Sequence, residues 1–196
     1  MSKIKSENTG SKKEVIITAA AKLFKEKGYK AASMRELASV LGVEAASLYN
    51  HIKSKDELLR IICFEVNQTY QTNIEAIENE SNTIISKVEK LLRFHVKMMI
   101  EKYEKVYVAD HDWRKMEEPN LSTHRELRRN YRKKFTAIVQ QGIDSNEIKA
   151  IDANSAVMIF INAMGAIDQW HRIIHKVDSQ SFEDIMISIL IDGIKK

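Results

Sequence analysis

Apolar residues recur along the chain with the three- and four-residue spacing of helices. Near the N-terminus, Ile16, Ala19, Ala20, Leu23 and Phe24 form one such stripe. This spacing is typical of an amphipathic α-helix, whereas a half-buried β-strand alternates apolar and polar residues. Alternating β-branched runs are absent, and the chain has only one proline and six glycines. The pattern predicts an all-α protein of about nine helices.

Further stripes of the same kind mark helices later in the chain. They lie at residues 34–41, 88–99 and 127–139. Gly28, Gly42 and Gly142 follow the stripe at 16–24 and those at 34–41 and 127–139. Because glycine readily adopts the left-handed conformation that terminates helices, we expect each of these glycines to end its helix.

Helix starts are marked by a capping-box pattern, a serine or threonine followed three positions later by glutamate. Ser33, Ser54 and Thr123 each show it. The hydroxyl accepts a hydrogen bond from a first-turn N–H, and the glutamate bonds back to the cap. The Ser54 signal opens a long predicted helix, about 54–79. The expected organisation is a disordered tail (1–10), a three-helix DNA-binding domain (11–56) and a larger helical ligand-binding and dimerisation domain (57–196).

The most informative stretch is SMRELASVLGVEAASLYNHIKSKDELL, residues 33–59. A helix over 33–41, a turn at 42–43 and a helix over 44–50 have the spacing of a helix-turn-helix, which places its second helix in the DNA major groove. A helical hairpin with exposed polar residues has the same spacing, so this pattern alone does not separate the two. The apolar residues expected to pack the pair against the first helix are Met34, Leu37, Leu41, Leu48 and Ile52.

The residues left to face outward suit two kinds of DNA contact. Hydroxyl, imidazole and ammonium groups position a protein on phosphates, whereas specificity comes from base edges. Arg35 suits guanine, Asn50 suits adenine, and Ala45 or Ala46 suits a thymine methyl group. The candidate DNA contacts are Ser33, Arg35, Glu44, Ala45, Ala46, Ser47, Tyr49, Asn50, His51 and Lys55.

The distribution of charge agrees with a partner that carries phosphates. Of the net charge of +4, residues 1–60 carry +5 (12 Lys and Arg against 7 Asp and Glu), and residues 61–196 carry −1 (19 against 20). Excess positive charge confined to one region is expected of a nucleic-acid-binding element. A solvated basic tail would give the same excess.

Composition and missing motifs exclude several classes of protein. The single cysteine, Cys63, cannot form an internal disulfide or a cysteine-based zinc cluster. No apolar run reaches the 18 or so residues of a membrane span, and the N-terminus lacks the apolar stretch of a secretory signal. We expect a cytoplasmic protein without membrane, metal or cofactor. Because glycine-rich phosphate loops, nucleophile elbows and H-E-x-x-H pairs are absent, we expect no enzyme.

The segments ITAAAKLFKEKGYKAASMRELASVLGV and SLYNHIKSKDELL, within residues 14–59, resemble the DNA-binding domain of the TetR family of bacterial transcriptional regulators. The resemblance implies a homodimeric, all-helical repressor of which the helix at 44–50 reads DNA. It also implies that Arg35, Tyr49, His51 and Lys55 contact DNA. Asn50 departs from the family pattern, which often has an aromatic residue or histidine there.

Two C-terminal segments, 154–174 and 182–194, are apolar on nearly all sides. Such helices are buried on two faces, and we expect one face to meet the core and the other a second subunit in a four-helix interface. A single large core without a partner is the alternative. The candidate interface residues are Ala163, Gly165, Ala166, Trp170, Ile185 and Ile189.

His95 lies on an apolar stripe and needs a polar partner, which Asn67, Asn162 or a ligand could supply. The candidate pocket residues are Phe64, His95, Met98, Met99, Trp113, Phe135, Met158 and Asn162. The basic run RELRRNYRKKF, 125–135, is either a solvated face or an anion site. The stretches around 113–142 and 165–173 are diffusely similar to TetR members that respond to fatty acyl-CoA.

Together these features predict a dimeric repressor released from a palindromic operator by a small hydrophobic molecule, with acyl-CoA or a lipid as candidates. The alternative is a DNA-binding protein without a small-molecule effector that is controlled by a protein partner.

Overall fold

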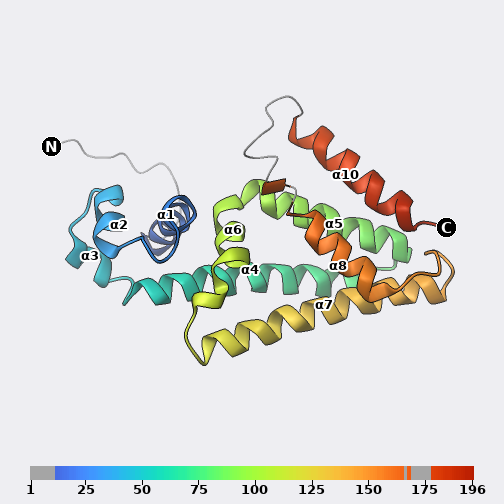
Figure 1. Cartoon of the computed structure of the whole chain (residues 1–196), viewed down its shortest axis with the longest axis horizontal. Helices are drawn as coiled ribbons and strands as arrows, with labels where there is room; N and C mark the ends of the chain where they lie inside the picture. Colours follow the sequence, from blue (N-terminus) through green and yellow to red (C-terminus); the bar gives the residue numbers. More distant parts are fainter. Residues whose placement is uncertain (1–11, 166, 169–177) are drawn as a thin grey trace.

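The structure is a computed structural model that describes residues 12–165, 167–168 and 178–196. Within these ranges it contains nine α-helices and one 3₁₀ turn, and no strands (Figure 1). An isolated bridge pairs Ile148 with Lys195 near the C-terminus. The all-α prediction is therefore confirmed. The predicted tail at 1–10 and two predicted interface residues, Ala166 and Trp170, lie outside the described ranges.

Three helices at one end of the molecule form a small N-terminal unit: α1 (Lys12–Lys27), α2 (Met34–Leu41) and α3 (Ala45–Tyr49). The long helix α4 (Lys55–Glu78) runs from this unit into the larger C-terminal part (Figure 1). That part also contains α5 (Ile84–Glu101), α6 (Tyr103–His111), the 3₁₀ turn η1 (Trp113–Lys115), α7 (Asn120–Asp144), α8 (Ala153–Ala163) and α10 (Ser179–Ile194).

Local signals set the ends of the first helices as predicted. Ser33 caps α2 with a complete capping box, because its hydroxyl accepts from the backbone N–H of Glu36 at 3.3 Å while the Glu36 carboxylate accepts from the N–H of Ser33 at 3.0 Å. Gly28 and Gly42 take the predicted left-handed conformation, with φ of 82° and 65°. The turn after α2 is thereby fixed, and α3 packs against α2.

Two predicted helix boundaries are wrong. Thr123 is not a cap, because α7 already begins at Asn120 and the Thr123 hydroxyl donates to the carbonyl of Pro119 at 3.0 Å. Gly142 does not end this helix, which continues to Asp144. A Cβ atom at Gly142 would lie 2.6 Å from Cδ1 of Ile148 and 2.9 Å from Cγ2 of Ile84. The glycine is there because other elements approach the helix closely.

Helix α6 joins the N-terminal unit to the rest, since it packs against both α1 and α4. Lys105 of α6, whose side chain is only 13% exposed, bonds Glu14 of α1 at 2.7 Å and Glu65 of α4 at 3.1 Å. Two residues earlier, the Tyr103 ring lies beneath the ammonium of Lys25 of α1, 4.1 Å from the ring centroid. These contacts fix the N-terminal unit against the larger part of the chain.

Candidate DNA interface and effector pocket

The surface of α3 divides into a buried side and an exposed side. Leu48 is 1% exposed and belongs to the core, whereas the neighbouring Tyr49 is 53% exposed although it is large and partly apolar. Arg35 of α2 is also exposed, so a basic and an aromatic side chain are both exposed on α2 and α3, at one end of the molecule (Figure 1). The other predicted DNA contacts that are exposed on this unit are Glu44, Ala46, Ser47, Asn50 and His51.

Three predicted DNA contacts have roles inside the chain. Ser33 is exposed, but its hydroxyl forms the cap of α2. Ala45 is half-buried and packs against the core, so its methyl group is less available than that of Ala46. Lys55 has the most defined internal role: its ammonium donates to the carbonyls of Tyr29, Lys30 and Ala32 at 2.9, 3.3 and 3.0 Å.

The Lys55 ammonium also lies 4.6 Å from the ring centroid of Tyr29, whose hydroxyl donates to Asp56. Lys55 and Asp56 therefore hold the loop between α1 and α2 onto the N-terminus of α4. An ammonium has three N–H donors, and three carbonyls engage them here. The sequence predicted that the Lys55 ammonium contacts phosphate. In the structure this ammonium supports the fold of the N-terminal unit.

We expect Lys55→Ala to lower the free energy of unfolding by about 1–3 kcal/mol, because it leaves the partly buried carbonyls of Tyr29 and Ala32 without this donor. The slope of log affinity for DNA against log salt concentration should not change, whereas loss of a phosphate contact flattens it by about 0.9. Denaturant unfolding and DNA titrations at several salt concentrations measure both. Lys53→Ala, at an exposed lysine nearby, is the matched control. A flatter slope with unchanged stability would assign Lys55 to phosphate instead.

A cavity of about 500 Å³ lies in the C-terminal part, with walls from α4, α5, α6, η1, α7 and the segment that begins with α8. Pockets for small molecules have this size, and they combine apolar walls with a few placed polar groups. Five predicted pocket residues line this cavity. They are His95, Met99, Trp113, Met158 and Asn162.

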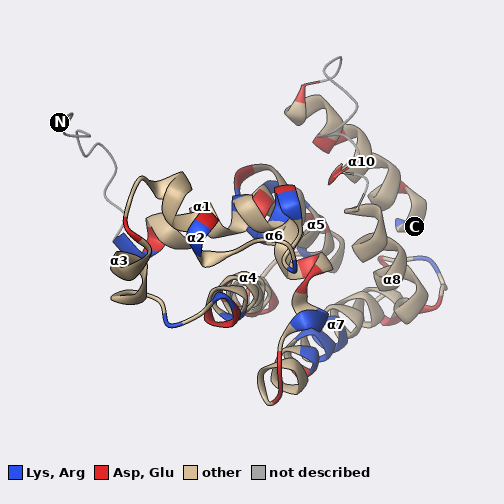
Figure 2. Ribbon diagram, turned by 60° about the vertical axis from the view of Figure 1, so that its left-hand side comes forward, with Lys and Arg blue, Asp and Glu red and all other residues tan. Residues whose placement is uncertain are grey.

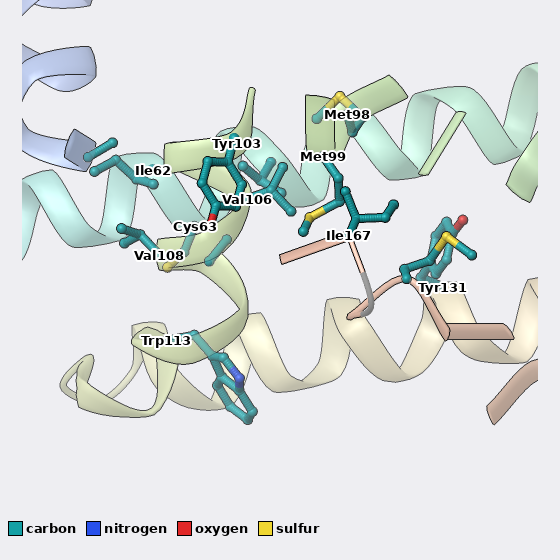
Figure 3. Close-up of a cluster of buried hydrophobic side chains, with 14 of the residues drawn as sticks. Ile62, Cys63, Met98, Met99, Tyr103, Val106, Val108, Trp113, Tyr131 and Ile167 are labelled. Atoms are coloured by element: carbon teal, nitrogen blue, oxygen red, sulfur yellow. The ribbon is translucent and has the colours of Figure 1, made fainter. Parts of the chain in front are cut away.

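Three other predicted pocket residues, Phe64, Met98 and Phe135, are not among the cavity's lining residues. Phe135 is completely buried and stacks against Phe160 between α7 and α8. Met98 and its neighbour Met99 diverge from α5, and Met99 extends toward Ile167 (Figure 3). Phe64 packs against a ring of the wall, that of His124. Apolar spacing places all three in the core but does not show which core residues border a cavity.

His95 has its partner inside the protein. Its Nε2 lies 2.7 Å from the hydroxyl of Tyr131, and its ring stacks on Tyr70 with centroids 4.4 Å apart. Neither predicted partner, Asn67 or Asn162, is bonded to it: Asn67 bonds His124, and Asn162 donates to the backbone of Met158. Burial, with a smaller contribution from Arg128, lowers the pKa of His95 to about 4. His95 is therefore a neutral member of an aromatic wall.

The sequence did not single out His124, another residue of the cavity wall. It is 1% exposed, and its Nδ1 lies 3.3 Å from Nδ2 of Asn67. A signal was present, because the stripe through Leu127, Tyr131 and Phe135 extends back by one turn to position 124. The wrongly placed helix start at Thr123 concealed it.

The cavity has a cationic side. Arg114, Arg128 and Arg132 line it, and Lys and Arg residues gather along α7 (Figure 2). Arg128 is paired with Asp110 at 2.9 Å. Arg114 lies over Trp113, with its guanidinium carbon 4.6 Å from the ring centroid. The basic run of α7 thus contributes Arg128 and Arg132 to the cavity, while Arg125, Arg129 and Lys133 are exposed and Lys134 pairs with Glu75 of α4.

Exposed apolar side chains cluster on α8 and α10, at the end of the molecule opposite α1–α3 (Figure 1). Ile185 and Ile189 of α10 are 55% and 67% exposed, and Met158 and Ile159 of α8 are similarly exposed. Of the other predicted interface residues, Ala163 is half-buried and Gly165 is exposed. Large exposed apolar side chains on two helices at one end of the molecule make this end a candidate interaction surface.

Among the described residues, no three or more His, Cys, Asp or Glu side chains lie together where they could hold a metal ion. Among the same residues, every helix is too short or too polar to cross a membrane.

Two family models together match most of the chain. The model for "Bacterial regulatory proteins, tetR family" matches residues 16–62, and the model for "Tetracyclin repressor-like, C-terminal domain" matches residues 81–194. The first model runs from α1 to the start of α4 and includes α2 and α3. The second covers most of the cavity wall.

Individual proteins match along nearly their whole length. The HTH-type transcriptional repressor KstR2 of Mycobacterium tuberculosis is 22% identical to this chain. The match covers 95% of this chain and 94% of KstR2. The fatty acid metabolism regulator protein of Bacillus subtilis is 23% identical, with 91% and 93% covered. The structure of ketosteroid transcriptional regulator KstR2 superposes with a TM-score of 0.88 at 18% identity, over 96% of this chain and 97% of that one.

A further structural neighbour is AibR in complex with isovaleryl coenzyme A and operator DNA, with a TM-score of 0.81 at 17% identity, covering 92% of this chain and 98% of that one. At such identities the structural matches establish the fold, and the two family models establish the relationship. The chain belongs to the TetR family of bacterial transcriptional regulators, DNA-binding proteins with an N-terminal helix-turn-helix and a helical C-terminal domain.

Proposed function

We propose that this protein is a dimeric repressor that binds a palindromic operator through α3 and is released by a small amphipathic molecule in the cavity between α4 and α8. The exposed face of α3 carries this proposal. A helix that buries Leu48 and exposes Tyr49, Asn50 and His51 presents hydrogen-bonding groups of the kind that read a major groove.

Dimerisation is supported by the exposed apolar side chains of α8 and α10, which would be covered by the same surface of a second copy. A twofold dimer binds two half-sites about one helical turn, roughly 34–36 Å, apart. The operator should accordingly be close to palindromic.

The nature of the effector follows from the cavity wall. Its aromatic and apolar groups suit a hydrocarbon body, and its arginines suit an anionic group. Related proteins agree with this chemistry, since one is described as a fatty acid metabolism regulator and another was solved with isovaleryl coenzyme A. We therefore propose an acyl-CoA or a related lipid as the effector.

Release from DNA requires the effector to favour one conformation over another, because a ligand shifts an equilibrium only by its differential affinity. Helix α6 is placed to transmit such a shift. Its C-terminal half lines the cavity through Tyr107 and Asp110, while Lys105 bonds α1 of the DNA-binding unit.

The test starts with selection of the operator from random DNA by the purified protein, followed by titration of that operator with and without octanoyl-CoA. We expect a palindromic sequence, one dimer per site and weaker binding in the presence of the acyl-CoA. Arg35→Ala should weaken operator binding by about 1–3 kcal/mol and relax the preference at one base pair per half-site. Loss of equal size on operator and random DNA would contradict base reading by Arg35. No preference for any sequence would contradict the proposed function.

A further inference from the structure

His124 is a buried polar side chain in the wall of the cavity. The ring is 1% exposed and lies between the rings of Phe64 and Trp113, each with its centroid 5.7 Å away. Such a position is expensive for an imidazole unless both ring nitrogens find partners, because a buried unpaired donor or acceptor is destabilising.

Only one of its two nitrogens is bonded. Nδ1 lies 3.3 Å from the amide nitrogen of Asn67, which donates, so Nδ1 is the acceptor and the ring proton resides on Nε2. Nε2 has no hydrogen-bond partner in the described part of the chain. His95, the other buried histidine of the cavity, differs because its Nε2 is bonded to Tyr131. Among the described residues of the cavity wall, His124 therefore contributes a buried N–H donor without a hydrogen-bond partner.

We propose that the Nε2–H of His124 is the group that recognises the effector, by donating a hydrogen bond to an uncharged carbonyl oxygen. This inference rests on the proposed sensing function and specifies its chemistry. The carbonyl belongs to an acyl ester or thioester, because an oxygen that accepts one hydrogen bond between two aromatic rings matches this environment. An ionised carboxylate matches it less well, since the neutral ring offers it a single hydrogen bond and the guanidinium of Arg128 is already paired with Asp110.

The charges around the ring support an uncharged acceptor. Burial and, to a smaller extent, Arg128 lower the pKa of His124 to about 4, so the imidazole is neutral at physiological pH and offers a single donor. Arg128 itself is paired with Asp110. Within the described ranges, the exposed Arg114 and Arg132 have no ion-pair partner. The anionic end of the effector lies at these two arginines, and the carbonyl lies deeper.

The decisive probes are two ligands that differ only in that carbonyl: octanoyl-CoA, a thioester, and S-octyl-CoA, the corresponding thioether. Calorimetric titration of the full-length protein gives the dissociation constant of each. We expect the wild-type protein to bind the thioester about tenfold more tightly, the size of one neutral hydrogen bond to a buried donor. His124→Phe, which keeps a ring but removes the donor, should bring this ratio close to one.

Two variants separate recognition from mere packing. His124→Gln places an amide N–H near the position of Nε2 and should restore most of the thioester preference. Tyr131→Phe removes a hydroxyl from the same cavity that is already bonded to His95, and it should keep the preference. Melting temperatures identify any variant that fails to fold, and the comparison of the two ligands on the wild-type protein then still decides whether the carbonyl is recognised.

The outcomes distinguish this inference from the proposed function. Equal binding of the two ligands by the wild-type protein, with octanoyl-CoA still releasing the operator, would overturn the role of His124 and leave the sensing function intact. Binding of neither ligand would overturn the assigned ligand class. Selective binding of a palindromic operator would then still support the proposed role as a DNA-binding regulator. A thioester preference that survives in His124→Phe would assign the carbonyl to another group.

Discussion

Replacement of Ile189 by aspartate is expected to convert the proposed dimer to a monomer and to lower operator affinity by about 10²–10⁴-fold, the advantage that linking two binding units provides. Ile189 is 67% exposed in the single chain and Ile185, one turn earlier, is 55% exposed. In a dimer that covers both, a carboxylate would be removed from water without a partner, which is strongly unfavourable. Sedimentation analysis gives the oligomeric state, and fluorescence anisotropy of labelled operator gives the affinity.

Ala76→Asp is the matched control, because it places the same charge at an exposed apolar residue of α4, outside the two helices of the proposed interface. This variant should remain dimeric and bind the operator as the wild type does. A dimeric Ile189→Asp protein with full affinity would show that the exposed apolar residues of α10 are not the dimer contact.

Leu48→Ala should have the largest effect on folding of the N-terminal unit, about 3–5 kcal/mol, the range expected for a fully buried leucine whose removal leaves a cavity. Leu48 is 1% exposed and is the buried anchor of α3, a helix of only five residues. Too short to be stable alone, α3 depends on this contact for its position. Hydrogen exchange of α1–α3 and operator titration measure the two consequences, early opening of the unit and loss of DNA binding.

The neighbouring Tyr49 provides the contrast, since it is 53% exposed. Tyr49→Ala should change stability by no more than about 0.5 kcal/mol, as exposed substitutions usually do, yet weaken DNA binding. If Leu48→Ala retained both its exchange protection and its affinity, the packing of α3 would not depend on this residue. If Tyr49→Ala unfolded the unit, its effect on DNA would be indirect.

The elements that sequence predicted well are those encoded by nearby residues. The cap at Ser33 and the turns at Gly28 and Gly42 depend on contacts within four residues, and the structure confirms each. The exposed side of α3 also followed from spacing, because burying Leu48 leaves Tyr49 and Asn50 outward. Local chemistry and periodicity were sufficient for this half of the candidate site.

The predictions that failed depend on distant residues. The partner of His95, for which Asn67 and Asn162 were expected, comes from α7, 36 positions away. Gly142 is explained by the approach of Ile84 and Ile148. Periodicity shows that a residue is buried, but it does not show against what, so cavity walls and hydrogen-bond partners required the fold.

The two halves of α6 make different contacts, and this has a practical consequence for the design of biosensors. The half that begins at Tyr103 carries the contacts to α1, and the half that ends at His111 lines the cavity. Cavity residues on α5 and α7 are therefore separable from the contacts that α6 and α4 make with the DNA-binding unit. A library of variants at the cavity residues of those helices could change which small molecule the regulator binds, while its response at the operator stays the same.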